Sequence, residues 1–170
     1  MKNFLVKKIE QLMDIDINVL AKESKEEGFR FVERLVNDYE SGMNTFCLPG
    51  EALFAVFTHA GEPAAIGGLN RDPFSAEKAI GRLRRFYVRQ IYRRTWIGSL
   101  LLTEILSEAK KHYDTVVLHT DTVEADEFYT SYGFSKGEGY LNSTHFLRLT
   151  GEPVTSEHER TGIVHKPLID

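Results

Sequence analysis

The sequence predicts an α/β fold, a single domain with a mixed central β-sheet flanked by helices. Three observations predict it: a strand, turn, strand pattern in the middle of the chain, an amphipathic helix over 97–109, and a strand, helix, strand, helix order through the second half. That order implies a right-handed crossover, so the strands expected at 80–88 and 115–119 should be parallel neighbours. The hairpin in the first half then makes the sheet mixed.

The first element is helical. Apolar residues at helical spacing predict a helix over 17–41, which is either continuous or divided near Gly28. Asp14 or Asp16 is the expected N-cap, and Gly42 the expected stop.

Two apolar runs, 53–57 and 64–69, flank a turn composition at 59–63 and therefore predict a β-hairpin. Residues 80–88 then alternate, which predicts a third strand. The alternation places Arg82, Arg84 and Phe86 on one face and Leu83, Arg85 and Tyr87 on the other.

The second half continues with the amphipathic helix, whose buried face is expected to carry Ile97, Leu101, Ile105 and Ala109. A β-branched strand is expected at 115–119 and a short helix at 125–132, closed by Gly133 in the C′ position. Tyr140 and 144–149 suggest one or two closing strands, and 151–170 is a polar, weakly patterned tail.

The composition is that of an ordinary globular protein. The chain has 170 residues, of which 42% are apolar and 11% aromatic, and no apolar run is long enough to cross a bilayer. The N-terminus does not resemble a secretory signal, so we expect a cytoplasmic protein with no membrane partner. Cys47 is the single cysteine, which excludes an internal disulfide framework. A net charge of −4 and a pI near 5.9 argue against a nucleic-acid partner.

The segment 86–109 runs from a β-like stretch through an arginine-rich turn that holds Gly98 into the amphipathic helix. The first turn of a helix leaves N–H groups without intrahelical partners, and these add to the helix dipole to attract anions. No carboxylate lies between Glu77 and Glu104, so the chain has one local basic region, formed by Lys78, Arg82, Arg84, Arg85, Arg89, Arg93 and Arg94. The junction therefore predicts a phosphate-bearing ligand. Ligands of open α/β sheets bind beyond the carboxyl ends of the strands, where this turn and the 120–124 loop both emerge.

Two segments resemble motifs of the GNAT family of N-acetyltransferases: Val88–Leu101 (VRQIYRRTWIGSLL) and Ala125–Phe134 (ADEFYTSYGF). In that family a Q/R-x-x-G-x-G/A loop opens a helix and binds the pyrophosphate of acetyl-CoA. A later A-x-x-L-Y-x-x-x-G-F helix supplies a tyrosine near the thioester. The resemblance extends from about Leu53 to Phe134 and implies a GNAT-like domain over 1–150, followed by the tail at 151–170.

Carried over by position, Arg93 takes the Q/R place, Gly98 the last glycine place and Tyr129 the tyrosine place. Trp96 stands where the family usually has its first loop glycine, and its indole adds bulk where glycine allows close approach of a phosphate. With ordinary helical angles, Trp96 would turn its ring onto the core or over the cofactor. Thr122 stands where family members often have an asparagine, and its hydroxyl replaces only part of that amide's hydrogen bonding.

The resemblance implies transfer of an acetyl group from acetyl-CoA to a primary amine of an unidentified small-molecule or peptide acceptor, by direct attack in a ternary complex. Tyr129 is then the catalytic acid that protonates the departing sulfur. Backbone N–H groups of Phe86, Tyr87 and Val88 contact the pantetheine and thioester. The remaining implied cofactor contacts are Arg93, Arg94, Thr95, Trp96, Ile97, Gly98, Ser99, Thr122 and Phe128. No metal is implied, and family analogy allows a monomer or a homodimer.

The general base is not identified by the sequence. An alkylamine with a pKa of about 10.4 must lose a proton before attack, and the strand at 80–88 has no carboxylate where many family members carry a glutamate. Other candidates are Glu51, His119, Asp121 and Glu124. Two further functions stay open: a catalytically degenerate acyl-CoA sensor or interaction module, and an RNA-contacting domain that uses the arginines.

Overall fold

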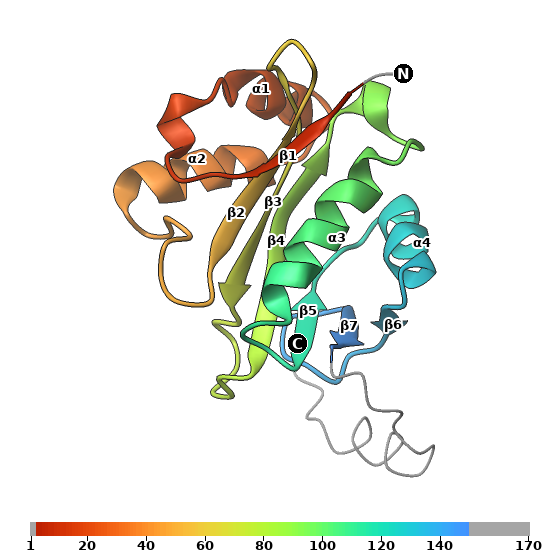
Figure 1. Cartoon of the computed structure of the whole chain (residues 1–170). Coiled ribbons are helices and arrows are strands. Elements are labelled where there is room, and N and C mark those ends of the chain that lie inside the picture. The colour runs from red at the N-terminus through yellow and green to blue at the C-terminus, as the bar shows by residue number, and fades with distance from the viewer. Residues whose placement is uncertain (1–2, 150–170) are drawn as a thin grey trace. The chain divides into compact units, whose positions relative to one another are not determined.

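The computed structural model describes residues 3–149, so the predicted tail at 151–170 lies outside the described residues. No helix in this described part of the chain is long and apolar enough to span a bilayer. The elements, in chain order, are β1 (Leu5–Lys8), the short 3₁₀ helix η1 (Leu12–Asp14), α1 (Asn18–Glu26), α2 (Phe31–Ser41), β2 (Ala52–Phe57), β3 (Pro63–Arg71), β4 (Ile80–Val88), the 3₁₀ helix η2 (Gln90–Tyr92), α3 (Ile97–Ala109), β5 (Thr115–Leu118), α4 (Val123–Ser131), β6 (Ser135–Lys136) and β7 (His145–Arg148) (Figure 1).

The strands form one mixed seven-stranded sheet in the order β1-β2-β3-β4-β5-β7-β6. β2 and β3 pair antiparallel, which confirms the predicted hairpin. β4 and β5 pair parallel from Ile80 to Arg82, which confirms the predicted crossover. The edge strand β1 was not predicted; its four residues pair antiparallel with β2.

The chain divides into two compact units. The first comprises the described residues up to Asn70 together with Leu83–Glu108, and the second comprises Arg71–Arg82 and the described residues from Ala109 onward. β4 contributes to both units, since the boundary falls between Arg82 and Leu83.

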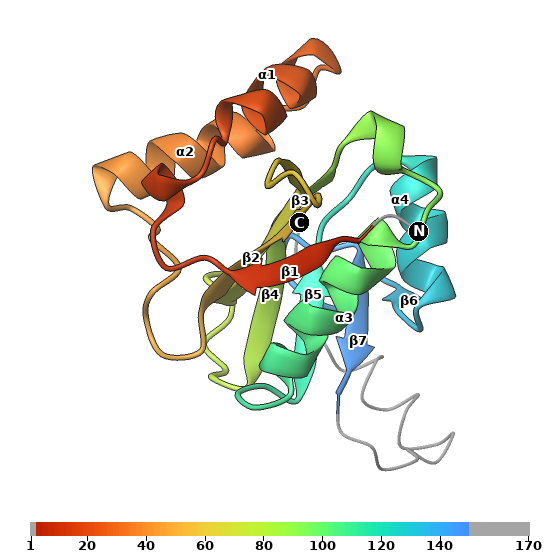
Figure 2. The ribbon, with the colours of Figure 1, turned by 45° about the horizontal axis from the view of Figure 1, so that its top comes forward.

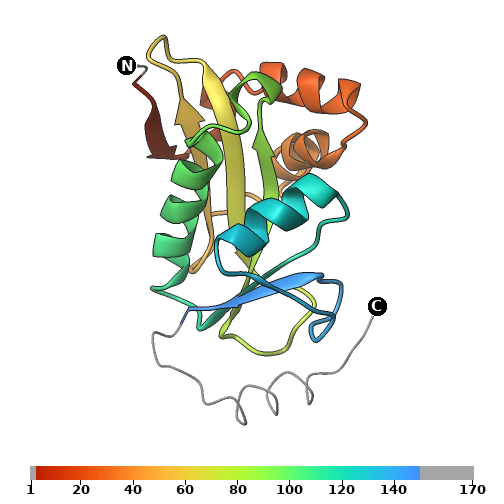
Figure 3. The same ribbon diagram turned by 90° about the vertical axis from the view of Figure 1, so that its right-hand side faces the viewer.

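In the first unit, helices cover both faces of the sheet: α1 and α2 lie on one face and α3 lies on the other (Figures 2 and 3). Alternate residues of the strands pack under α1 and α2, because side chains of a strand point in turn to opposite faces. The buried core on this face consists of Leu12, Ile17, Leu20, Val32, Leu35, Phe46, Leu53, Ala55, Ile66 and Tyr87.

Gly67 and Gly68 in β3 allow close packing on both faces of the first unit. A Cβ at Gly67 would lie 2.9 Å from side-chain atoms of Ile105 and Phe86, on the α3 face. A Cβ at Gly68 would lie 2.4 Å from the ring of Phe46, on the opposite face. The two glycines therefore serve packing, and no phosphate site is needed to explain them.

The predicted N-terminal helix is divided, and Gly28, with a φ of 87°, lies at the break. The expected N-caps are wrong, because α1 follows Ile17 with no side-chain cap and Asp14 lies in η1. The expected stop is confirmed: Gly42 ends α2 in the left-handed conformation, with a φ of 81°.

In the second unit, Arg82 of β4 is buried and forms an ion pair with the buried carboxylate of Asp72, with 2.8 Å between Nε and Oδ1. Its two terminal nitrogens donate to the backbone carbonyls of Leu141 and Asn142, at 2.9 and 3.0 Å. Burying a charge is costly unless it is paired and hydrogen-bonded, and here both conditions are met. Arg82 therefore joins two loops of this unit and is not available to a ligand.

The predicted strand β4 is present, and its extended backbone is interrupted at Arg85, which has a φ of 59°. Beyond this residue, Phe86 packs toward Gly67 and α3, while Tyr87 belongs to the core under α1 and α2.

Of the predicted closing strands, β7 and the two-residue β6 are present and pair antiparallel. Tyr140 lies outside both strands and packs against the small core of Ile80, Val117 and Phe146.

Candidate functional site

The β4–α3 loop, residues 89–96, leads from the end of β4 into the first turn of α3. The amide of Leu100 donates to the carbonyl of Trp96, which makes Trp96 the N-cap of α3. The hydroxyl of Thr95 accepts a hydrogen bond from the amide of Ile97 at 3.3 Å. The amides of Gly98 and Ser99 have no hydrogen-bond partner within residues 3–149. The start of α3 therefore presents the unpaired N–H groups that an anion requires.

The Trp96 ring does not lie in the core. The indole packs edge-on against Phe4, with ring centroids 5.4 Å apart, and is 51% exposed. Phe4 also contacts Tyr92 edge-on at 5.3 Å, so the N-terminal segment holds the loop through two aromatic rings. The left-handed residue of the loop is Arg94, with a φ of 58°, and not Trp96. A tryptophan at the family's first glycine place therefore requires no left-handed backbone here.

The predicted local basic region is largely neutralised by carboxylates from distant parts of the chain. Besides Arg82, three arginines form ion pairs within the first unit: Arg85 with Asp38, Arg89 with Glu23, and Arg93 with Glu27. A stretch without acids in the sequence does not prevent such pairing, because partners come from other elements. Arg94 is exposed and has no ion-pair or hydrogen-bond partner in the described part of the chain.

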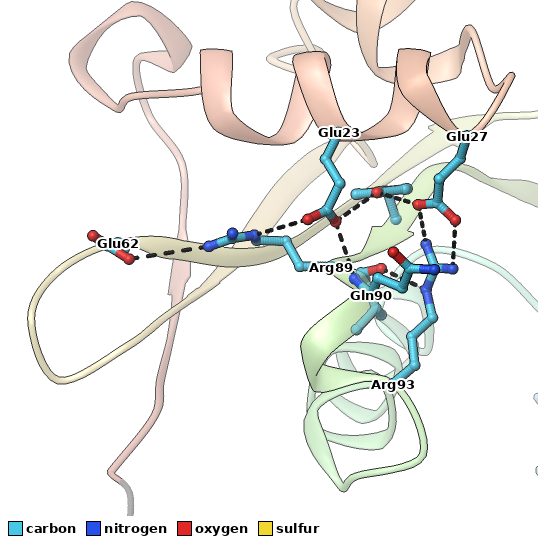
Figure 4. A network of polar contacts seen from close by, with 8 residues as sticks. Glu23, Glu27, Glu62, Arg89, Gln90 and Arg93 are labelled. Atoms are coloured by element: carbon cyan, nitrogen blue, oxygen red, sulfur yellow. Dashed lines mark hydrogen bonds and ion pairs between the residues drawn. The ribbon is translucent and has the colours of Figure 1, made fainter.

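Glu23 of α1 and Glu27, the C-cap of the same helix, hold the β4–α3 loop (Figure 4). The carboxylate of Glu27 accepts a hydrogen bond from each terminal nitrogen of Arg93, both at 2.7 Å. The Nε of Arg93 donates a hydrogen bond to the backbone carbonyl of Val88 at 2.9 Å. The carboxylate of Glu23 accepts the backbone amide of Gln90 at 3.0 Å.

The hydroxyl of Tyr87 joins β4 to the same two carboxylates. It lies 2.7 Å from Glu23 Oε2 and 2.5 Å from Glu27 Oε1. Burial raises the pKa of Tyr87, and the two carboxylates raise it further, so the phenol stays protonated and donates. The hydrogen bond from Arg93 lowers the pKa of Glu27, which keeps this carboxylate ionised.

In the second unit, Tyr129 lies buried on α4. Gly133, with a φ of 95°, ends the helix in a Schellman motif: its amide donates to the carbonyl of Thr130, and the amide of Phe134 donates to the carbonyl of Tyr129. This turn brings the ring of Phe134 against that of Tyr129, edge-on with centroids 5.5 Å apart. The Gly-Phe pair of the motif therefore fixes the position of the tyrosine.

A second contact holds the same helix. His145 of β7 is 1% exposed, and its Nε2 lies 2.6 Å from Oδ1 of Asp126, one turn before Tyr129 on α4. An ionised carboxylate only accepts hydrogen bonds, so this contact places a proton on Nε2. The ring of His145 lies 6.4 Å from that of Tyr129, measured between centroids.

Residues 19–147 match the family model described as an acetyltransferase (GNAT) domain. The chain belongs to the GNAT acetyltransferase family. The match spans both units, which are therefore parts of one GNAT domain, and the predicted fold class and family are confirmed.

Solved structures of acetyltransferases have a similar fold. A candidate acetyltransferase from Exiguobacterium sp. 255-15 is 30% identical, with a TM-score of 0.78 over 86% of this chain and 93% of its own. The GNAT acetyltransferase YhbS from Escherichia coli, solved with CoA, is 13% identical, with a TM-score of 0.68 over 99% of this chain and 89% of its own. A GNAT acetyltransferase from Staphylococcus aureus Mu50 is 18% identical, with a TM-score of 0.65 over 87% of this chain and all of its own. No curated protein matches the chain. The GNAT fold supports acyl transfer from acyl-CoA in general.

The remaining predicted residues of this GNAT domain have structural partners or lie on the surface. Thr122 is the N-cap of α4, and its hydroxyl accepts the amide of Ala125 at 3.2 Å. Phe128 packs against Tyr129 and Tyr132.

Of the candidate bases, Glu51 accepts hydrogen bonds from the side-chain amide of Asn70 at 2.7 Å and from the backbone amide of Leu48 at 3.2 Å. His119, Asp121 and Glu124 are exposed. Within residues 3–149, no group of three or more potential ligand side chains is arranged to hold a metal ion.

Sequence reasoning missed Glu23, Glu27 and the pair formed by His145 and Asp126. Glu23 of α1 and its C-cap Glu27 are four residues apart, and like charges at this spacing repel each other on one helix face. That spacing is a signal for a basic partner. No comparable signal links Asp126 to His145, because the two residues meet only after the β7 strand has formed.

Proposed function

We propose that this GNAT protein transfers an acetyl group from acetyl-CoA to a primary amine of a small-molecule or peptide acceptor. The observation that carries the proposal is the unpaired N–H pair of Gly98 and Ser99 at the start of α3, in a chain that also carries the tyrosine motif of the family. The CoA bound by the Escherichia coli relative supports acyl-CoA as the donor.

The pyrophosphate is proposed to lie against the first turn of α3. The amides of Gly98 and Ser99 would donate to it, and the dipole of the thirteen-residue α3 favours its negative charge. Arg94, exposed and without a partner in the described chain, would add the one free positive charge of the loop.

The thioester is proposed to lie along β4. Phe86 to Val88 lie in the part of β4 beyond its pairing with β5, which covers Ile80 to Arg82. Backbone amides of this part of β4 would act as fixed donors to the pantetheine and the thioester carbonyl, as the family resemblance implies.

In the proposed reaction, the neutral amine nitrogen attacks the carbonyl carbon, the new C–N bond forms and the C–S bond breaks. The sulfur leaves with the bonding electron pair and takes the phenolic proton of Tyr129. The nitrogen gives its extra proton to solvent, from which the Tyr129 phenolate takes a proton back. Burial raises the pKa of Tyr129, so the phenol keeps its proton at neutral pH.

The test is release of CoA thiol from acetyl-CoA over a panel of primary amines, with wild type and Tyr129→Phe. We expect turnover on at least one amine and a fall in kcat of about 10²–10⁴-fold in the variant, the range for loss of a general acid. The Kd for CoA should stay the same. Saturable CoA binding without turnover on any amine would instead indicate an acyl-CoA sensor. An unaltered kcat in the variant would remove the acid role of Tyr129.

A further inference from the structure

Arg93 stands at the family's Q/R place, yet its side chain is already bound within the first unit. Both terminal nitrogens face Glu27 in a bidentate pair, and Nε donates to Val88 (Figure 4). The bidentate face of a guanidinium is the one that recognises a phosphate. In Arg93 that face is occupied by the carboxylate of Glu27, the C-cap of α1.

Glu23 and Glu27 also hold the part of the chain that precedes this arginine. Glu23 accepts the amide of Gln90, three residues before Arg93, and the hydroxyl of Tyr87 lies between the two glutamates. Glu23 and Glu27 share one face of α1 because they are four residues apart. The helix therefore holds β4 at Tyr87, and the β4–α3 loop at Gln90 and Arg93.

We propose that Glu23 and Glu27, the α1 clamp, are positioning residues for the cofactor, and that Arg93 is their anchor in the loop. The proposal rests on the proposed function. The pyrophosphate is then bound by the amides at the start of α3 and by Arg94. The clamp keeps the loop in the conformation that presents these groups.

This arrangement and direct phosphate binding by Arg93 predict opposite effects of Glu27→Gln. If Arg93 is a phosphate ligand, the substitution releases its guanidinium and removes a nearby negative charge, so CoA binds equally well or more tightly. If Arg93 is an anchor, the loop loses its charged bidentate contact and CoA binds more weakly. We expect a rise in Kd of roughly tenfold, the scale of a lost hydrogen bond to a charged group.

Glu26→Gln is the matched control. Glu26 is the adjacent residue of α1, is exposed, and has no hydrogen-bond or ion-pair partner in the described chain. The substitution removes the same charge without touching the loop, so it should leave the Kd for CoA unchanged or slightly lower.

The experiment is isothermal titration of CoA, and of pantetheine as a probe without the pyrophosphate, into wild type, Glu26→Gln, Glu27→Gln, Arg93→Gln and the double variant Glu27→Gln with Arg93→Gln. Near-ultraviolet circular dichroism checks that each variant folds. If Glu27→Gln does not fold, Arg93→Gln tests the same contact. We expect Glu27→Gln and Arg93→Gln each to bind CoA more weakly than wild type. The double variant should bind CoA no more weakly than either single variant. The affinity for pantetheine should be unchanged in all of them.

If wild type binds CoA and Glu27→Gln binds it equally well or more tightly, the clamp proposal is overturned and the proposed function is not. Losses that add in the double variant also overturn it, because two residues acting through one contact are not additive. Equal losses for pantetheine overturn it as well, since the effect would not concern the pyrophosphate. A folded wild type that binds no CoA overturns the proposed function and the clamp together.

Discussion

At the residue scale, the first turn of α3 shows how backbone and side chain divide their roles. Trp96 is the N-cap residue, and its backbone carbonyl accepts the first hydrogen bond of the helix. Its side chain makes no capping bond and packs against Phe4. Ser99, two residues after Ile97 begins the helix, is half-buried and its amide is unpaired in the described chain. No acidic residue lies in this first turn, although an acid there is normally favourable to a helix. An anion from outside the chain would complement the same N–H groups.

Ser99→Glu should therefore change stability and binding in opposite directions. A carboxylate in the first turn stabilises a helix by about 0.3–1 kcal/mol, so the free energy of unfolding should be unchanged or higher. The same carboxylate would lie beside the pyrophosphate, and the Kd for CoA should rise by at least roughly tenfold from charge repulsion. Urea unfolding and CoA titration measure the two effects.

The control for this substitution is Ser99→Gln, which has nearly the same shape as glutamate and no charge. It should weaken CoA binding much less than Ser99→Glu. Equal affinity of the Glu and Gln variants would show that the start of α3 is not the pyrophosphate site.

At the element scale, the end of α4 links a backbone conformation to the proposed catalytic group. Only the turn made by Gly133 allows the amide of Phe134 to reach the carbonyl of Tyr129, and that bond sets the two rings together. The pattern 125–134 predicts this helix and its end, because both depend on residues within ten positions of one another. The contact between His145 and Asp126 holds the same helix but joins residues nineteen apart, so the pattern does not predict it.

Gly133→Ala should lower both stability and activity. A left-handed alanine costs about 1–2 kcal/mol in the free energy of unfolding, and a Cβ at this position would meet Leu147 at an ordinary 3.6 Å, so the backbone accounts for the loss. Because the turn fixes Tyr129, kcat should fall as well. Urea unfolding and thiol release are the measurements.

Gly61→Ala provides the comparison. Gly61 has a φ of 87° in the turn between β2 and β3, with open space around its Cβ position. It should show a similar loss of stability and an unchanged kcat. If both variants lose kcat to the same extent, the loss reflects reduced stability and not the placement of Tyr129.

At the scale of the whole molecule, ion pairs formed by residues far apart in the sequence occur in both units. Arg93 with Glu27 is one in the first unit, and His145 with Asp126 is one in the second. Asp126 has a lowered pKa, chiefly because His145 donates a hydrogen bond to it and further because Lys136 lies nearby. Glu27 also has a lowered pKa, chiefly because of Arg93. Lowered pKa values in the folded state make stability depend on pH.

Acid should therefore destabilise the protein. A carboxylate whose pKa is lower in the folded than in the unfolded state stabilises the fold above the unfolded value, about 3.9 for Asp and 4.3 for Glu. That contribution is lost as pH falls through the folded value. The midpoint of urea unfolding should fall steadily between about pH 5 and pH 3.

Asp126→Asn tests one source of this dependence. The variant should be less stable than wild type at pH 7, and the difference between the two should shrink as the pH is lowered. A difference that stays constant down to pH 3 would show that the ionised form of Asp126 does not contribute.

The sequence by itself determined what depends on neighbours along the chain: the hairpin of β2 and β3, the parallel crossover from β4 to β5, helices α3 and α4, and the two family motifs. Periodicity and turn residues encode these features locally. Only the tertiary structure decided where the charges of the arginine turn go and where the Trp96 ring lies. The partners, Glu23, Glu27 and Phe4, come from α1 and the N-terminal segment. Pairing of buried or half-buried charges depends on which elements pack together, and residue spacing does not encode that.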